Sequence, residues 1–108
     1  MPQMVEADPQ QIKDWLDQDQ AILIDVREHQ ELAQFAIAGA VHNPMSNFDF
    51  DAVPGDSLKK LVFVCAHGVR SRQVGEYLLG ENKIPAAYNM TGGVAAWAQG
   101  GLPRQEGS

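Results

Sequence analysis

The chain contains one cysteine, and its surroundings are typical of a nucleophile held in an anion-binding loop. Cys65 directly follows the apolar residues 61–64 and precedes a short loop and a helix-like segment at residues 71–82. Loop N–H groups and the positive end of a helix dipole favour a bound anion. They also favour the thiolate, which is the nucleophilic form of cysteine. We therefore expect a reactive sulfur at Cys65.

The alternative is that Cys65 is a structural residue, because free cysteines are among the most buried residue types. Two features of the loop favour chemistry. Gly68 permits a turn with positive φ. Arg70 and Arg72 stand at the start of a helix, where the macrodipole disfavours cations unless an anion is bound nearby. We interpret Cys65 as functional on these grounds.

Composition restricts the class of protein. A chain of 108 residues is expected to form one domain, residues 1–108, with a single core. Its 8 basic and 14 acidic residues give a net charge of −6, which argues against nucleic acid and anionic membranes as partners. The first residues do not resemble a signal peptide, and one cysteine cannot form an intramolecular disulfide, so we expect a cytoplasmic protein. The three histidines and the cysteine lack metal-ligand spacing, so neither a metal nor a cofactor is expected.

Apolar runs alternate with amphipathic segments along the chain. We expect strands at residues 21–26, 41–43, 61–64 and 87–90, helices at residues 9–18, 28–36, 71–82 and 92–99, and a loop at residues 47–57. This alternation predicts a parallel sheet with helices on both faces. Ligands of such sheets bind at the carboxyl ends of the strands. Cys65 lies at one of these ends, Asp25 and Arg27 at a second, and Gly92 and Gly93 at a third.

Three motifs, in order along the chain, are similar to those of the rhodanese family of sulfurtransferases. They are Asp25-Val26-Arg27-Glu28 with Ile37-Ala38-Gly39-Ala40-Val41-His42-Asn43-Pro44, then Cys65-Ala66-His67-Gly68-Val69-Arg70 with Ser71, and finally Asn89-Met90-Thr91-Gly92-Gly93-Val94-Ala95-Ala96-Trp97 with Gly101-Leu102-Pro103. The resemblance is to the single-domain, cysteine-bearing members. It implies a three-layer α/β/α domain with a mainly parallel sheet of about five strands. One position departs from the family, because Ala36 stands where a histidine is common, and we expect a local packing change there.

The resemblance also implies a reaction. A sulfane sulfur would move from thiosulfate or another persulfide donor to cyanide, a small thiol or a thioredoxin-like acceptor, through a persulfide on Cys65. Arg70 would bind the sulfonate end of the donor. The loop residues Ala66, His67, Gly68, Val69 and Ser71 would surround the transferred sulfur, with backbone N–H groups stabilising its negative charge.

The remaining candidates have supporting roles. Arg72 is expected either to steer anions or to be a solvated helix residue. His67 is expected at the rim of the loop as a substrate contact rather than as a general base. Asp25 and Arg27 are expected to form an ion pair or hydrogen-bond network, with Glu28 or Glu31 as partners. Gly92 and Gly93 would let the backbone approach closely and begin a helix.

Three alternatives stay open at this point. A cysteine-dependent phosphatase or arsenate reductase has five residues between cysteine and arginine, whereas only four separate Cys65 from Arg70. A non-catalytic binding module is disfavoured because the loop retains its cysteine. A relay protein would deliver sulfur to a protein acceptor, with Phe48 and Phe50 as candidate docking residues, although we expect both rings to pack beneath their loop.

Overall fold

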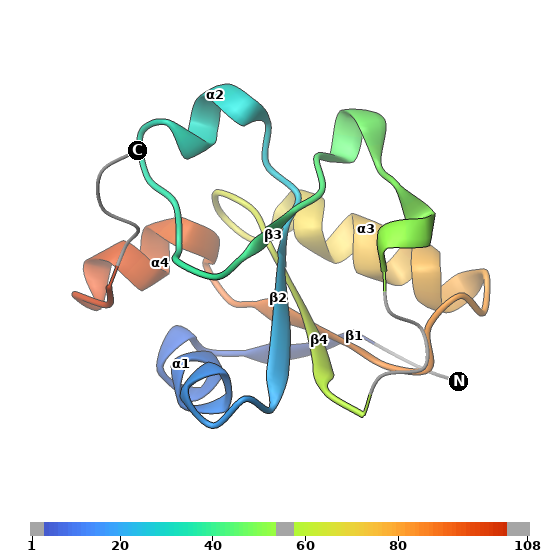
Figure 1. The fold of residues 1–108 in the computed structure, drawn as a ribbon, viewed down its shortest axis with the longest axis horizontal. Helices are drawn as coiled ribbons and strands as arrows, with labels where there is room; N and C mark the ends of the chain where they lie inside the picture. The colour runs from blue at the N-terminus through green and yellow to red at the C-terminus, as the bar shows by residue number, and fades with distance from the viewer. Residues whose placement is uncertain (1–3, 54–57, 104–108) are drawn as a thin grey trace.

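The computed structural model describes residues 4–53 and 58–103, which form one five-stranded sheet with helices packed against it (Figure 1). In chain order the elements are β1 (Met4–Ala7), α1 (Pro9–Asp17), β2 (Ala21–Asp25), α2 (His29–Leu32), β3 (Val41–His42), β4 (Lys60–Val64), α3 (Val69–Gly80), β5 (Ala87–Met90) and α4 (Gly93–Gln99). Two short 3₁₀ helices, η1 (Met45–Asn47) and η2 (Phe50–Ala52), follow β3. The strand order is β1-β5-β4-β2-β3, and neighbouring strands are parallel. The predicted parallel α/β sheet is confirmed.

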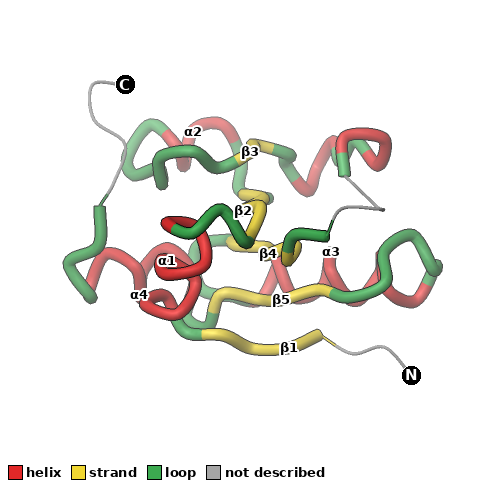
Figure 2. Tube along the Cα trace, turned by 60° about the horizontal axis from the view of Figure 1, so that its bottom comes forward, coloured by secondary structure: helices red, strands yellow, loops and turns green. Residues whose placement is uncertain are grey.

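Both faces of the sheet are buried, which explains why its central strands are almost wholly apolar. Along β4, Val62 and Val64 point into a core shared with α1 and α4, whereas Leu61 and Phe63 point into a core shared with α3. Figure 2 shows α1 and α4 lying together, with α3 on the other side of the strands. The three-layer arrangement follows directly from this alternation.

The N-terminal strand was not predicted. β1 pairs in parallel with β5, from Met4 opposite Ala87 to Ala7 opposite Met90. Only Ala7 of its four residues is buried. An edge strand with one buried residue has neither the apolar run nor the alternation by which strands are recognised. Its position beside β5 brings Glu6 close to the end of that strand.

Two predicted helices have different limits in the structure. The helix expected at residues 28–36 is only the four-residue α2, which begins with a capping box between Glu28 and Glu31. The helix expected from Ser71 begins earlier, at Val69, because Gly68 adopts a left-handed conformation (φ 97°) at its N-cap. The predicted loop at residues 47–57 contains η2, and its residues 54–57 lie outside the described residues.

The carboxyl ends of the strands meet at one edge of the sheet. The Val26 N–H donates to the carbonyl of Val64 (3.0 Å), which joins the end of β2 to the end of β4. The Val94 N–H donates to the carbonyl of Cys65 (2.8 Å), which joins α4 to the same place. Within the described ranges, no helix has the length and apolar character of a membrane span.

Candidate active site

Cys65 lies at the end of β4 with its sulfur turned toward the backbone of the following loop. The residue is 1% exposed. The Gly68 N–H donates to Cys65 Sγ (3.1 Å), and the Ser71 hydroxyl lies 3.3 Å from the same sulfur. The left-handed backbone at Gly68 turns its N–H inward and starts α3, so the short loop between strand and helix closes around the sulfur.

This environment stabilises the thiolate of Cys65. Burial raises the pKa of the thiol, since a buried charge is poorly solvated. Hydrogen bonds from the Ser71 side chain and from the backbone of Ser71, Gly68 and His67 act in the opposite direction and outweigh burial. The pKa of Cys65 therefore lies below the ordinary value of a cysteine, and the sulfur is a better nucleophile at neutral pH.

Hydrogen bonds connect Ser71 through the buried side chain of Asn89 to Gly68 and Glu6. The Ser71 hydroxyl lies 2.5 Å from Asn89 Oδ1, and Asn89 Nδ2 donates to the Gly68 carbonyl (3.0 Å) and to both carboxylate oxygens of Glu6 (3.2 and 3.1 Å). A hydroxyl has one proton, so Asn89 and the sulfur compete for it. Asn89 and Glu6 did not figure among the predicted site residues. Asn89 does stand in the quoted closing motif, but a polar residue inside the apolar β5 was the only sequence signal.

The start of α4 packs directly against the cysteine loop. Gly92 and Gly93 both have positive φ values (77° and 66°). A side chain at Gly93 would meet the backbone of Cys65 and Ala66, with the Ala66 carbonyl carbon only 2.5 Å from the Cβ position. The N–H groups of Val94 and Ala95 donate to the carbonyls of Cys65 (2.8 Å) and Ala66 (3.1 Å). This end of α4 thus holds the loop backbone in place.

Asp25 and Arg27 form a buried ion pair behind the loop. Arg27 Nη2 lies 2.8 Å from Asp25 Oδ2, and the side chains are 5% and 1% exposed. The same guanidinium donates to the carbonyls of Phe35 (2.7 Å) and Glu31 (3.4 Å). The pair therefore connects the end of β2 to the segment around α2. Of the two expected partners, Glu31 is contacted through its backbone, whereas Glu28 bonds to Ser46.

Arg70 pairs with Glu31, 39 residues earlier in the chain. Two parallel hydrogen bonds join the guanidinium to the carboxylate, at 3.0 and 2.9 Å. This contact lowers the pKa of Glu31 and raises that of Arg70, so both groups remain charged. Both side chains are about one-third exposed.

Arg72 and His67 lie at the surface. The Arg72 side chain is 55% exposed, and its Nε lies 3.6 Å from Glu6 and 3.8 Å from Glu76. These distances favour the expectation of a solvated helix residue. His67 is also exposed, in keeping with a place at the rim of the loop.

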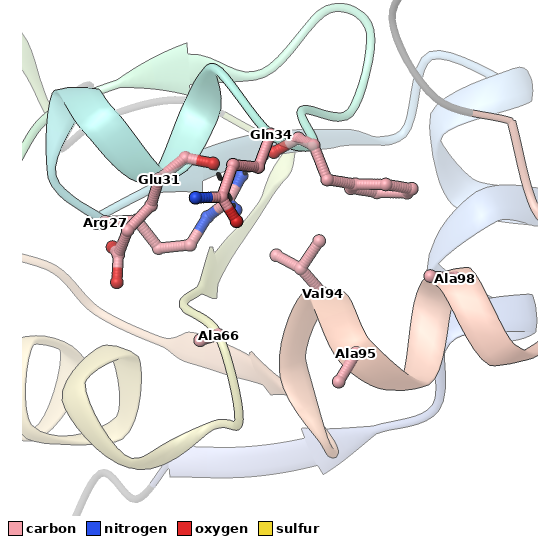
Figure 3. Close-up of a pocket in the computed structure, with 8 residues that line it drawn as sticks. Arg27, Glu31, Gln34, Ala66, Val94, Ala95 and Ala98 are labelled. Atoms are coloured by element: carbon pink, nitrogen blue, oxygen red, sulfur yellow. Dashed lines mark hydrogen bonds between the residues drawn. The ribbon is translucent and has the colours of Figure 1, made fainter.

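A cavity of about 300 Å³ opens beside Ala66, between α2 and α4 (Figure 3). Val94, Ala95 and Ala98 line it from α4. Gln34, Glu31 and Arg27 line it from the opposite side, as the close-up shows. The cavity thus reaches the residue next to Cys65, with an apolar wall on one side and a polar rim on the other.

Ala36 stands at the position where the family commonly has histidine, and it is buried at 8% exposure.

The expectation that Phe48 and Phe50 both pack beneath their loop holds for only one of the two rings. Phe48 packs against the α3 side of the core, as expected. The expectation for Phe50 was wrong: its ring is 43% exposed and lies between the rings of Phe48 and Tyr77 (5.2 and 5.8 Å between centroids). Phe50 is the first residue of the 3₁₀ helix η2.

Among the described residues, no three His, Cys, Asp or Glu side chains are grouped so that they could hold a metal ion. The site consists of one sulfur with a lowered pKa, the hydrogen-bond donors around it and an arginine at the end of the loop.

Comparison with known proteins agrees with this geometry. The family model described as "Rhodanese-like domain" matches residues 8–100. A sulfurtransferase of Allochromatium vinosum is 34% identical over 81% of this chain and 80% of its own length. The thiosulfate sulfurtransferase GlpE of Haemophilus influenzae is 32% identical over 91% of each chain. The crystal structure of a rhodanese-related protein from Thermoplasma volcanium superposes with a TM-score of 0.80 at 25% identity, covering 94% of this chain and 97% of the other.

Proposed function

Since the chain belongs to the rhodanese-like domain family, we propose that it is a sulfurtransferase that carries sulfane sulfur as a persulfide on Cys65. The observation that carries this proposal is the cradle around Cys65 Sγ, in which Gly68 and Ser71 supply hydrogen bonds to a sulfur of lowered pKa. The same donors suit the terminal sulfur of a persulfide, which is also anionic. The family match over residues 8–100 supports one domain as the carrier of the whole activity.

In the first half-reaction, the Cys65 thiolate attacks the outer sulfur of the donor. With thiosulfate, a bond forms between Cys65 Sγ and that sulfur while the bond to the sulfonate sulfur breaks, and sulfite leaves with the electron pair. The negative charge then rests on the new terminal sulfur of Cys65, where backbone N–H groups stabilise it. A separate general base is unnecessary because the thiolate is already favoured. In this scheme the exposed His67 contacts the substrate and does not act as a general base.

In the second half-reaction, an acceptor attacks the terminal sulfur and regenerates the thiolate. Cyanide gives thiocyanate, and a small or protein-borne thiol, such as that of a thioredoxin-like protein, gives a persulfide. The scheme is a double displacement with a covalent enzyme intermediate. The lone cysteine, which cannot form an intramolecular disulfide, supports the cytoplasm as the compartment in which this happens.

Arg70 is proposed to bind the sulfonate of thiosulfate and to stabilise departing sulfite. In the structure its guanidinium is engaged by Glu31. When thiosulfate binds, the Arg70 guanidinium must therefore either break its hydrogen bonds to Glu31 or donate to Glu31 and to the sulfonate at the same time.

The phosphatase alternative gains no support from the site. Only four residues separate Cys65 from Arg70, and the single arginine of the loop already holds a carboxylate. A phosphate monoester would need several donors around a tetrahedral dianion. The cradle described above presents its donors to one sulfur.

The proposal is tested by turnover with thiosulfate and cyanide, measured as thiocyanate. The wild-type chain should turn over, and Cys65→Ser should lose at least about a thousandfold of that rate, because an alcohol does not replace the thiolate as nucleophile. The circular dichroism spectrum of Cys65→Ser should match that of the wild type. Ser46→Ala, a change at an exposed serine bonded to Glu28, serves as the matched control and should keep the rate. Full activity of Cys65→Ser would remove the cysteine from the mechanism.

A further inference from the structure

The cation best placed to recognise thiosulfate is already occupied by an acid of the same chain. Arg70 and Glu31 are joined by two hydrogen bonds of 2.9 and 3.0 Å, the fork geometry in which arginine recognises a carboxylate. A sulfonate would compete for these same N–H groups. The carboxylate of Glu31 is also tied to the Glu28 N–H (2.9 Å), so it is held in position rather than free to swing away.

The other two arginines near the loop are engaged as well. Arg27 is buried and directs its guanidinium to Asp25 and to the carbonyls of Phe35 and Glu31. Arg72 lies between Glu6 and Glu76 at the surface. Each arginine that a dianion such as thiosulfate would meet near Cys65 therefore already forms an ion pair with a carboxylate.

The cavity beside Ala66 suits a different kind of molecule. Its α4 wall consists of Val94, Ala95 and Ala98, which offer apolar contacts and no charge (Figure 3). Its volume of about 300 Å³ lies at the lower end of the range of small-molecule sites. A short carbon chain attached to a sulfane sulfur would fit this apolar wall, and Ala66, which also lines the cavity, directly follows Cys65 in the chain.

Building on the proposed sulfur transfer, we propose that Glu31 is a specificity-determining residue that selects organic persulfides over thiosulfate as the sulfur donor. Glu31 does this by occupying Arg70 and by placing a negative charge at the cavity rim. The organic part of the donor lies in the cavity beside Ala66. In this reaction Cys65 Sγ forms a bond to the outer sulfur of R–S–SH, the S–S bond of the donor breaks, and R–S⁻ leaves with the electron pair. The proton stays on the transferred sulfur, and no oxidant or reductant is consumed.

The test compares the second-order rate constants of sulfur loading on Cys65, followed by intact mass, for two donors. One donor is thiosulfate, and the other is the persulfide of 2-mercaptoethanol, which bears no charge outside its persulfide group. Because the donors differ in intrinsic reactivity, the change between variants is the readout. Glu31→Gln should raise the thiosulfate constant about fivefold, the size expected for releasing a partly exposed ion pair. It should change the organic persulfide constant less than about twofold. The amide oxygen of the new side chain can still accept the Glu28 N–H, so α2 keeps its cap.

Two further variants separate this mechanism from a simple change of charge. Glu76→Gln removes one negative charge from the outer surface of α3 and should leave both constants unchanged. In an Arg70→Ala background, Glu31→Gln should no longer raise the thiosulfate constant, because the benefit passes through Arg70. Equal rises with both donors, no rise with thiosulfate, or a rise that persists without Arg70 would each overturn the proposal. If the wild-type chain gained sulfur from neither donor, the proposed function itself would fail, and this inference with it.

Discussion

At the scale of single residues, the chemistry depends on how Cys65 is solvated. The sulfur is buried, which raises its pKa, and yet the pKa lies below the ordinary value because hydrogen bonds oppose burial. The Ser71 hydroxyl, 3.3 Å away, makes the largest of these opposing contributions. Loss of this hydroxyl is therefore expected to raise the pKa of Cys65.

Ser71→Ala should shift the pH dependence of sulfur loading toward alkaline pH. The loading rate follows the thiolate, so it rises as pH increases through the pKa of Cys65. Removing a donor to the thiolate raises that pKa, and the rising limb moves with it. At pH values above both pKa values the two proteins should load sulfur at similar rates. The measurement is the rate of mass gain across pH, with Ser46→Ala as the matched hydroxyl deletion. An unshifted limb in Ser71→Ala would show that Ser71 does not stabilise the thiolate.

Some residues of the site could be predicted from the sequence, and others could not. The loop from Cys65 to Arg70 could be selected as a candidate site from the sequence because its members are contiguous, and because a helix start beside a cysteine favours the thiolate. The partner of Arg70 could not, because Glu31 lies 39 residues away and is brought close only by the packing of α2 against the strand ends. Asn89 was hidden for the same reason, since its hydrogen bonds join β5 to β1 and to α3.

At the scale of elements, the cysteine loop is fixed by its contact with α4. The first N–H groups of α4 would otherwise lack partners, and they bind the carbonyls of Cys65 and Ala66 instead. This contact is possible only because Gly93 carries no side chain. The glycine pair before an amphipathic segment predicted where the helix begins. The sequence did not show that Gly93 contacts the backbone of Cys65 and Ala66, which only the fold brings close.

Gly93→Ala should therefore destabilise the protein by about 2–4 kcal/mol, through a strained positive φ and a clash with the loop backbone. Gly100→Ala is the matched control, because Gly100 has φ −78° and the nearest atom to a new Cβ there lies at an ordinary 3.5 Å. Its free energy of unfolding should change by less than about 1 kcal/mol, and in the stabilising direction. Urea unfolding measures both. Equal stabilities of the two variants would contradict the described contact between α4 and the loop.

Elements with a clear apolar run or apolar stripe were predicted from the sequence. The strand β1 and the short length of α2 were not. The buried strands β2, β4 and β5 follow from apolar runs, and α1 follows from its Asp8 cap and apolar stripe. The Asp8 side chain accepts the Gln11 N–H at 2.8 Å, as a cap does. β1 pairs along its whole length with β5, and Arg27 donates hydrogen bonds to the carbonyls of Glu31 and Phe35, in and just after α2. Neither contact is visible in a local window of sequence.

At the scale of the whole molecule, the charge of the chain opposes its anionic donor. The net charge is −6. Thiosulfate is a dianion, so long-range repulsion should slow its approach, and salt should screen that repulsion.

The loading rate with thiosulfate should therefore rise by about two- to threefold as sodium chloride increases from about 20 to about 200 mM, since the Debye length falls across this range. The rate with an organic persulfide carrying less charge should respond less. The second-order rate constants at several salt concentrations check this. A thiosulfate rate that falls with added salt would mean that a positive field at the site governs the approach, contrary to the paired arginines described above.

The proposed sulfur transfer requires Cys65 to carry the transferred sulfur as a persulfide. The most direct measurement is the intact mass of the protein before and after treatment with thiosulfate or an organic persulfide, and again after cyanide. We predict a gain of about 32 Da, one sulfur atom, that is absent in Cys65→Ser and is lost to cyanide as thiocyanate. No gain from either donor, or the same gain in Cys65→Ser, would contradict it.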